Sequence, residues 1–370
     1  MGFIGIYQCL KIMKITVLTI NNKSFTRAEL LTYSKFKTGD EKTPSWEKAI
    51  YQFLLIWFND SETIVQFSSG TTGKSKELNL SKQSMIRSAE NTCTYFDLRK
   101  GQTAVLCLPV NYIAGKMMII RCIVGGLNLQ LIEPKGEPDL LGIGSIDFIA
   151  MVPHQVLNTL VKDEDIPAIK KLIVGGAEIN ADLERKLSQR PGEIYATYGM
   201  AETCSHIAVR RINGVNAEPF YRALPGIKLK IDGRNCLVIE ANYLPGRIIT
   251  NDMVELTGNN SFRWIGRYDN LINLGGIKIV PEELEAEITA ETGLECALVA
   301  LPDKLRGQKV VLVFEQGKHQ PDEESFKIIF ANKLFRHLQK DAFIYVDKFP
   351  RNNSLKIDRR ELIRMIELRK

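Results

Sequence analysis

A loop rich in Gly, Ser and Thr directly follows the apolar segment IVQF, and its residue types are suited to binding phosphate. The loop runs from Ser68 to Lys76 with the sequence SSGTTGKSK. Small residues let backbone N–H groups and hydroxyls approach phosphate oxygens closely, and lysines add positive charge. The P-loop of nucleotide hydrolases would need Gly where this chain has Ser68. Taken alone, the loop therefore indicates either a phosphate-binding loop or a polar turn.

Further segments with small and charged residues follow in a fixed order. They are Val174–Glu178 (VGGAE), Tyr198–Thr203 (YGMAET), Thr250–Asp252 (TND), Gly266–Asp269 (GRYD) running on to Gly275–Pro281 (GGIKIVP), and Pro350–Arg359 (PRNNSLKIDR). Each segment alone has an ordinary interpretation. Tyr198 could be a core aromatic residue, Glu202 an acid at a helix start, Asp252 a turn residue and Lys356 a surface lysine.

In this order, the segments resemble the adenylate-forming superfamily of acyl- and aryl-CoA ligases, peptide-synthetase adenylation domains and firefly luciferase. The resemblance extends from about residue 64 to the end of the chain. It implies ATP, Mg²⁺ and CoA as cofactor and co-substrates, and a carboxylic acid as the small-molecule partner. It also implies Thr72, Glu202 and Lys356 as catalytic residues, with Glu202 holding the metal.

The resemblance also implies which residues bind the nucleotide, which residue forms the hinge between the domains, and which residues line the CoA tunnel. The hinge between domains would be Asp269, and the CoA tunnel would pass Gly275 and Gly276. The ATP site would comprise the phosphate loop, the adenine-site segment, the aromatic residue that stacks on the base, and the residues that bond the ribose: Ser68, Ser69, Gly70, Thr71, Thr72, Gly73, Lys74, Gly175, Gly176, Ala177, Tyr198, Gly199, Asp252 and Arg267.

These residue types fit the chemistry of adenylation. Attack of a carboxylate on a phosphate brings two anions together, so the site must supply a metal ion and cationic donors aimed at the developing charge. Glu202 and Lys356 provide a metal ligand and a cation, and the reaction needs no acid–base pair. The four histidines have no metal-ligand spacing, which agrees with this chemistry.

The short N-terminal region and the segment LPVNYIAGKMMIIRCIVGG look like the o-succinylbenzoate–CoA ligases of menaquinone biosynthesis. Arg121 matches that family's basic helix position, whereas Tyr112 stands where His is common and Lys116 where an apolar residue is usual. A substrate with two carboxylates needs a cation for the second one. Tyr112, Lys116, Arg121 and His206 are the candidates for the acyl pocket.

Several alternatives remain open from the sequence. The enzyme could be another aryl- or acyl-CoA ligase, including one for fatty acids, or could load a carrier-protein thiol. Leu355 stands where the superfamily usually has Gly beside the catalytic lysine, which also leaves a non-catalytic adenylate-binding protein as a hypothesis.

The elements that must position these residues indicate an α/β protein. Apolar runs alternate with helix-like segments from Gln102 to Ala196, which is typical of βα units on a mainly parallel sheet. After about residue 215 the pattern predicts a small β-rich subdomain. Pro281 and the acids after it predict a helix start. We expect an N-terminal domain over 1–268, shortened at its start, and a small mobile α+β domain over 269–370.

Composition narrows the class of protein further. The formal charge of +6 comes from scattered basic residues, so the chain lacks a nucleic-acid-binding arm. The seven cysteines include no C-x-x-C pair and favour a reduced, cytoplasmic protein. No apolar run is long enough to span a bilayer, and the first residues lack the features of a secretory signal. The native start could be Met1 or Met13, and a homo-oligomer is possible.

Overall fold

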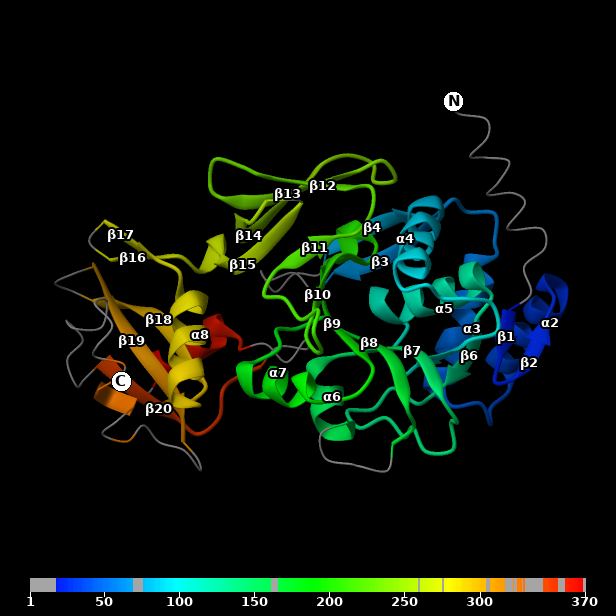
Figure 1. Ribbon diagram of the computed structural model, residues 1–370, viewed down its shortest axis with the longest axis horizontal. Coiled ribbons are helices and arrows are strands. Elements are labelled where there is room, and N and C mark those ends of the chain that lie inside the picture. Colours follow the sequence, from blue (N-terminus) through cyan, green and yellow to red (C-terminus); the bar gives the residue numbers. More distant parts are fainter. Residues whose placement is uncertain are drawn as a thin grey trace. The chain divides into compact units, whose positions relative to one another are not determined.

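The structure is a computed structural model that describes residues 18–68, 76–160, 166–258, 260–274, 276–303, 307–316, 322, 325–327, 329, 342–351 and 357–368. The chain divides into two compact units, and Figure 1 labels their helices and strands. The first unit comprises Met1–Ile179, Lys186–Lys228 and Ile239–Ile248. The second comprises Asn180–Arg185, Leu229–Val238 and Ile249–Lys370. The predicted boundary between residues 268 and 269 stays a prediction.

A mainly parallel sheet forms the centre of the first unit. Its strands lie in the order β11-β10-β9-β8-β7-β5-β6-β1-β2, and all neighbours from β9 to β1 are parallel. The strands are β1 (Leu18–Ile20), β2 (Lys23–Phe25), β5 (Thr103–Leu106), β6 (Asn128–Leu131), β7 (Ile146–Met151), β8 (Ile169–Val174), β9 (Glu193–Gly199), β10 (His206–Arg211) and β11 (Tyr221–Ala223). The predicted α/β class is confirmed.

Helices follow most of these strands, as expected for βα units. They are α2 (Arg27–Gly39), α3 (Ser45–Trp57), α4 (Lys82–Tyr95), α5 (Ile113–Gly125), α6 (Pro153–Thr159) and α7 (Ala181–Ser188). Ser81 is the N-cap residue of α4, and its hydroxyl accepts a hydrogen bond from the backbone N–H of Ser84. The left-handed conformation of Gly126 ends α5. Because α5 packs against α4, β5 and β6, its residues 117–123 are buried.

The β3–β4 hairpin brackets the predicted phosphate loop. Strands β3 (Thr63–Ser68) and β4 (Lys76–Ser81) are antiparallel, and Ser68 is paired with Lys76. The hairpin therefore fixes the two ends of the segment 69–75. Strand β4 also contacts the short 3₁₀ helix η1 (Ala201–Thr203), which carries Glu202.

A run of four strands follows β11, which confirms the predicted β-rich subdomain. They are β12 (Ile227–Ile231), β13 (Cys236–Ala241), β14 (Ile248–Leu256) and β15 (Ser261–Arg267). In the second unit, β14 and β15 form a hairpin that pairs Asp252 with Arg267. A 3₁₀ turn, η2 (Tyr268–Asn270), follows β15 directly.

The C-terminal part of the second unit is a small α+β assembly. It contains β16 (Ile272–Leu274), β17 (Ile277–Ile279), α8 (Pro281–Thr292), β18 (Cys296–Asp303), β19 (Gly307–Glu315), β20 (Phe343–Val346) and α10 (Arg359–Glu367). Alternate residues of β18 pack in two separate clusters, one with Leu284 of α8 and the other with Leu362 of α10. This alternation follows from the two-residue period of a strand.

A partly buried ion pair joins helices α8 and α10. The guanidinium of Arg359 donates to both carboxylate oxygens of Glu285, at 2.7 and 2.6 Å. Burial raises the pKa of Glu285, although Arg359 opposes this effect. Two charge-assisted bonds with planar geometry fix the start of α10 relative to α8.

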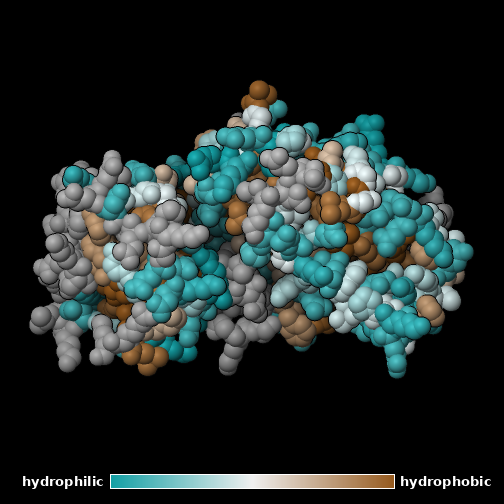
Figure 2. Space-filling model, turned by 90° about the horizontal axis from the view of Figure 1, so that it is seen from below, coloured by the Kyte–Doolittle hydropathy of each residue, from teal (hydrophilic) through white to brown (hydrophobic). Residues whose placement is uncertain are grey.

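Hydrophilic residues make up much of the described surface on the face shown in Figure 2, with smaller hydrophobic groups between them. Within the described residues, no helix is long and apolar enough to cross a membrane.

Candidate active site

The predicted adenine-site residues lie at the ends of two neighbouring parallel strands. Val174 of β8 pairs with Ala196 of β9, so the segments that begin at Gly175 and Tyr198 leave the same edge of the sheet. The carboxyl edge of such a sheet is the usual place for a ligand site. A Cβ on Gly175 would lie 2.1 Å from Oγ1 of Thr197, and only glycine avoids this clash. The structure thus brings both nucleotide segments together.

A tight turn after β9 presents Glu202. A Cβ on Gly199 would lie 2.3 Å from the carbonyl oxygen of Ser205, so the chain can fold back only at a glycine. The hydroxyl of Thr203 donates to the nearer carbonyl, that of Ser205, at 2.6 Å, and accepts from the backbone N–H of Met200 at 3.0 Å, which closes the turn. Within the part of the chain that the structure describes, the Glu202 carboxylate has no hydrogen-bond or ion-pair partner.

Two of the predicted acyl-pocket residues lie side by side in the first unit. Arg121 is 2% exposed, and its Nη2 donates to Oγ of Ser205 at 2.5 Å and approaches Nδ1 of His206 at 3.3 Å. Burial lowers the pKa of Arg121 to about 10, which leaves it protonated at neutral pH. No carboxylate among the described residues pairs with this guanidinium, and its Nε has no hydrogen-bond partner.

The neighbours of His206 fix its protonation. The hydroxyl of Thr92 donates to the Ser88 carbonyl at 3.0 Å, so it accepts from Nε2 of His206 at 3.3 Å. Nδ1 is then the acceptor for Arg121. Burial, together with the charge of Arg121, lowers the pKa of His206 well below its usual value. His206 is therefore a neutral hydrogen-bond partner and not a proton donor at neutral pH.

The other two acyl-pocket candidates have different surroundings. Nζ of Lys116 donates to Oε1 of buried Gln66 at 2.5 Å, and burial lowers its pKa. Tyr112 precedes α5 and is 47% exposed. The described contacts therefore do not join Lys116 or Tyr112 to the Arg121–His206 pair.

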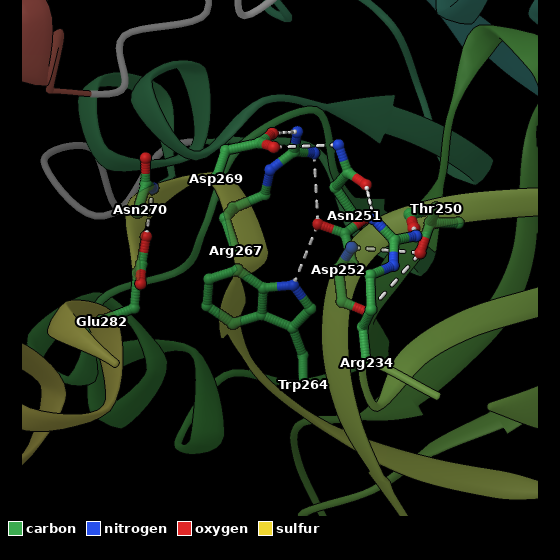
Figure 3. Close-up of polar contacts among 9 residues, drawn as sticks. All are labelled: Arg234, Thr250, Asn251, Asp252, Trp264, Arg267, Asp269, Asn270 and Glu282. Carbon is green, nitrogen blue, oxygen red and sulfur yellow. Dashed lines mark hydrogen bonds and ion pairs between the residues drawn. The ribbon is translucent and has the colours of Figure 1, made fainter. Parts of the chain in front are cut away.

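The predicted ribose-binding residues meet in the β14–β15 hairpin of the second unit (Figure 3). Arg267 donates to Oδ1 of Asp252 at 3.3 Å, and Nε1 of Trp264 donates to the same oxygen at 3.4 Å. Burial alone would lower the pKa of Arg267, but Asp252 and Asp269 raise it. Asp252 itself is 7% exposed. The hydrogen bonds from Arg267 and Trp264 hold its carboxylate in one orientation.

Trp264 was not predicted from the sequence because its position depends on a β-bulge. With regular alternation, residues 264 and 267 would face opposite sides of β15. The register shifts between Met253 and Val254, where their partners are Gly266 and Trp264. Ile265 is the extra residue, and the bulge turns Trp264 toward the face of Arg267.

Replacing Trp264 by phenylalanine is expected to weaken ATP binding by about two- to tenfold, since one long hydrogen bond to the Asp252 carboxylate, at 3.4 Å, is lost. Calorimetric titration of ATP in the presence of Mg²⁺ measures this change. Trp57, which lies in the first unit, provides the matched control. An unchanged ATP affinity in folded Trp264→Phe protein, with Trp57→Phe also unchanged, would remove Trp264 from the nucleotide site.

The predicted hinge residue contacts the same hairpin. Asp269 accepts from Arg267 at 2.6 Å through Oδ2 and from the Asn251 amide at 2.9 Å through Oδ1. Gly276 has a φ of +92°, and apart from its chain neighbours no described residue has an atom within 4 Å of a Cβ placed there. Open space beside Gly276 fits the predicted CoA tunnel. Other predicted residues lie outside the described residues: Ser69, Gly70, Thr71, Thr72, Gly73, Lys74, Gly275, Leu355 and Lys356.

Curated relatives share sequence along most of the chain. The 2-succinylbenzoate–CoA ligase of Lactococcus lactis is 24% identical, in an alignment that covers 81% of this chain and 70% of that protein. The ligase of the same name from Listeria monocytogenes is 24% identical, in an alignment that covers 90% of this chain and 74% of that protein.

Solved structures share the fold. An acyl-CoA synthetase (AMP-forming)/AMP-acid ligase II-like protein from Dyadobacter fermentans is 32% identical, with a TM-score of 0.59 over 90% of this chain and 98% of that chain. The o-succinylbenzoate coenzyme A synthetase of Bacillus subtilis, solved with ATP and a magnesium ion, is 16% identical. It has a TM-score of 0.71 over 97% of this chain and 98% of that chain.

The match to a family covers more than half of the sequence. The description of that family is AMP-binding enzyme, and the match runs from residue 16 to residue 246. This range includes the hairpin that brackets the phosphate loop, the adenine-site segments and Glu202. The chain belongs to the AMP-binding enzyme family.

Proposed function

We propose that this protein is an ATP-dependent acid–thiol ligase that activates o-succinylbenzoate as its acyl-adenylate and transfers the acyl group to CoA. The products are o-succinylbenzoyl-CoA, AMP and pyrophosphate, and the reaction belongs to menaquinone biosynthesis. Family membership supports the adenylate chemistry, and the names of the curated relatives support this substrate. The observation that carries the substrate assignment is the buried Arg121 guanidinium without a carboxylate partner among the described residues.

The first half-reaction joins the acid to AMP. A carboxylate oxygen of the acid attacks the α-phosphorus of ATP, and the bond from that phosphorus to the pyrophosphate oxygen breaks. In our assignment the phosphate loop holds the β- and γ-phosphates, Gly175–Ala177 and Tyr198 hold adenine, and Asp252 with Arg267 holds the ribose. Lys356 stabilises the charge that moves between the reacting groups.

Glu202 fits a magnesium ligand. Mg²⁺ is commonly bound by one or two carboxylates together with phosphate oxygens and water, so a single carboxylate without a partner among the described residues matches its preference. Mg²⁺ would neutralise the triphosphate and the pyrophosphate leaving group. Strand β4, which follows the proposed phosphate loop, contacts η1, which carries Glu202.

The second half-reaction transfers the acyl group. The thiolate sulfur of CoA attacks the acyl carbonyl carbon, and the bond to AMP breaks. In our assignment the small domain, residues 269–370, rotates about Asp269 between the two steps and presents Gly275 and Gly276 to the pantetheine arm. The absence of a side chain at Gly276 leaves room for that arm.

Arg121 supports a substrate with two carboxylates. A buried cation is costly unless an anion pairs with it, and o-succinylbenzoate has a second carboxylate after the first has reacted. The hydroxyl of Ser205, which contacts the same guanidinium, would donate a further hydrogen bond to that anion, while Nδ1 of neutral His206 accepts from Arg121 and orients the guanidinium. A fatty acid needs an apolar environment at the same place and would leave the guanidinium unpaired.

Another acyl- or aryl-CoA ligase activity is the second candidate. It is favoured by the similarity to the Dyadobacter fermentans protein, whose name specifies no acid. Transfer to a carrier-protein thiol would share the adenylation step. We place the enzyme in the cytoplasm, a proposal supported by the six described cysteines, which are all free and buried.

A panel of acids tests the proposed substrate. Purified protein is incubated with ATP, Mg²⁺ and CoA, and pyrophosphate release is measured for o-succinylbenzoate, benzoate and fatty acids of several lengths. The highest kcat/KM is expected for o-succinylbenzoate, because it alone can pair its second carboxylate with Arg121. A higher kcat/KM for a monocarboxylic fatty acid would overturn the substrate assignment and leave the adenylate chemistry in place.

A further inference from the structure

A closed ring of polar contacts links the proposed ribose site to the proposed hinge (Figure 3). Arg267 bonds both Asp252, at 3.3 Å, and Asp269, at 2.6 Å. The Asn251 amide donates to the other oxygen of Asp269, at 2.9 Å, and Asn251 precedes Asp252 in β14. Both oxygens of the hinge carboxylate are therefore bonded to the hairpin that carries the ribose-binding residues.

Arg234 fixes the orientation of the Asn251 amide. Its Nη1 donates to Oδ1 of Asn251 at 2.9 Å, and its Nη2 donates to the Thr250 carbonyl at 3.1 Å. Because Oδ1 accepts from a guanidinium, the amide nitrogen must be the atom that faces Asp269. The Arg234 guanidinium also lies over the Tyr268 ring, 5.0 Å from its centroid, and contacts the turn just before the hinge residue.

The residue after the hinge is held by a different element. The side-chain amide of Asn270 donates to Oε1 of Glu282 in the first turn of α8. Asp269 is thus bonded to the β14–β15 hairpin, and Asn270 is bonded to α8. A rotation that keeps both sets of contacts can use only the backbone torsions between these two residues, whereas a wider rotation must first break the contacts of Asp269.

We propose that Asn251 is a positioning residue that couples nucleotide binding to the hinge by holding Asp269 against the strand of the ribose-binding Asp252. The coupling rests on the proposed two-step reaction. The Asn251–Asp269 bond stabilises the arrangement in which ATP is bound and the adenylate forms, and it breaks before the hinge rotates for thioester formation. Asn251 acts through Asp269 and touches neither the acid nor CoA.

Two substitutions separate this role from a simple packing role. Asn251→Ala removes the bond to Asp269 and the bond from Arg234. Asn251→Asp has nearly the same shape and keeps an acceptor for Arg234, but it replaces the donor with a carboxylate oxygen that repels Asp269. Glu255→Gln, on the same strand, is the matched control because Glu255 pairs with Arg263 in an exposed contact.

The first measurement is backbone hydrogen exchange of the peptide containing residues 267–271 in the full chain, with and without ATP and Mg²⁺. Loss of one hydrogen bond predicts exchange that is about two- to tenfold faster in Asn251→Ala and at least as fast in Asn251→Asp. ATP affinity should change by less than about threefold in both variants, and Glu255→Gln should match the wild type.

The second measurement compares the two half-reactions separately. The ratio of thioester formation from preformed acyl-adenylate to adenylation should rise by at least about threefold in both Asn251 variants. Wild-type exchange or a wild-type ratio in Asn251→Asp would overturn the proposal, as would a tenfold or greater loss of ATP affinity in Asn251→Ala. If no acid in the panel is activated, the proposed function fails, but hydrogen exchange and ATP titration still test the coupling.

Discussion

Replacing Lys356 by alanine is expected to lower the rate of adenylation by about 10²–10³ while thioester formation continues at close to the wild-type rate. In the first step this lysine is assigned to the carboxylate and α-phosphate, where it stabilises charge that shifts between them. In the second step the small domain is proposed to withdraw it. Pyrophosphate exchange measures the first step, and preformed acyl-adenylate with CoA measures the second.

Two further variants make this test specific. Lys348 is an exposed lysine in the same C-terminal segment, and Lys348→Ala should leave both steps unchanged. Gly276→Trp should give the opposite pattern to Lys356→Ala, because an indole beside the proposed tunnel blocks the thiol and still lets the adenylate form. Wild-type adenylation by Lys356→Ala would show that the C-terminal motif, and the domain alternation based on it, is misassigned.

The described residues on either side of Lys356 are held in place by backbone pairing and by ion pairs. Arg351 and Ile357 form an isolated antiparallel bridge, so the residues between them start and end side by side. Arg351 also bonds Glu295 at 2.8 and 2.9 Å, and Arg359 bonds Glu285. These paired charges tie Arg351 to Glu295 and Arg359 to α8.

The sequence was most informative where one local pattern determines the structure. Pro281 with its following acids predicted a helix start, and α8 begins at Pro281 and ends where Gly293 adopts a positive φ. The alternation of apolar runs and helix-like segments predicted the parallel sheet, because each strand needs a crossover helix to return in the same direction. Gly175 and Gly199 lie where a Cβ would clash with a neighbour.

Long-range pairings could not be predicted in the same way. The contact of Trp264 with Asp252 depends on a bulge, and nothing in the local sequence marks its register. Arg121 could be identified as a basic helix residue, but its complete burial beside His206 follows from the packing of α4, α5 and β10. The Asn251–Asp269 contact joins a residue of strand β14 to a residue of the η2 turn, and it depends on the register of the hairpin.

Replacing Arg121 by methionine is expected to lower kcat/KM for o-succinylbenzoate by roughly 10- to 150-fold, the effect of losing a charge-assisted bond to the second carboxylate. Methionine fills similar volume without charge. Removing a buried cation stabilises the fold, whereas leaving Nδ1 of His206 without a donor destabilises it. Because these two effects oppose each other, the free energy of unfolding should change by less than about 2 kcal/mol. ATP affinity should stay at the wild-type value.

The effects of Arg121→Met on the activity with each acid, on stability and on ATP affinity distinguish two roles for Arg121. If Arg121 only supports the turn at Ser205, then Arg121→Met should lose stability and ATP affinity together, and benzoate should be affected as much as o-succinylbenzoate. If Arg121 binds the second carboxylate, the loss should be confined to the dicarboxylate, and Arg121→Lys should recover part of it. Lysine keeps the positive charge but lacks the planar fork that can bond two oxygens at once. A loss shared equally by mono- and dicarboxylates would therefore assign Arg121 to the scaffold and would withdraw the observation on which the choice of o-succinylbenzoate depends.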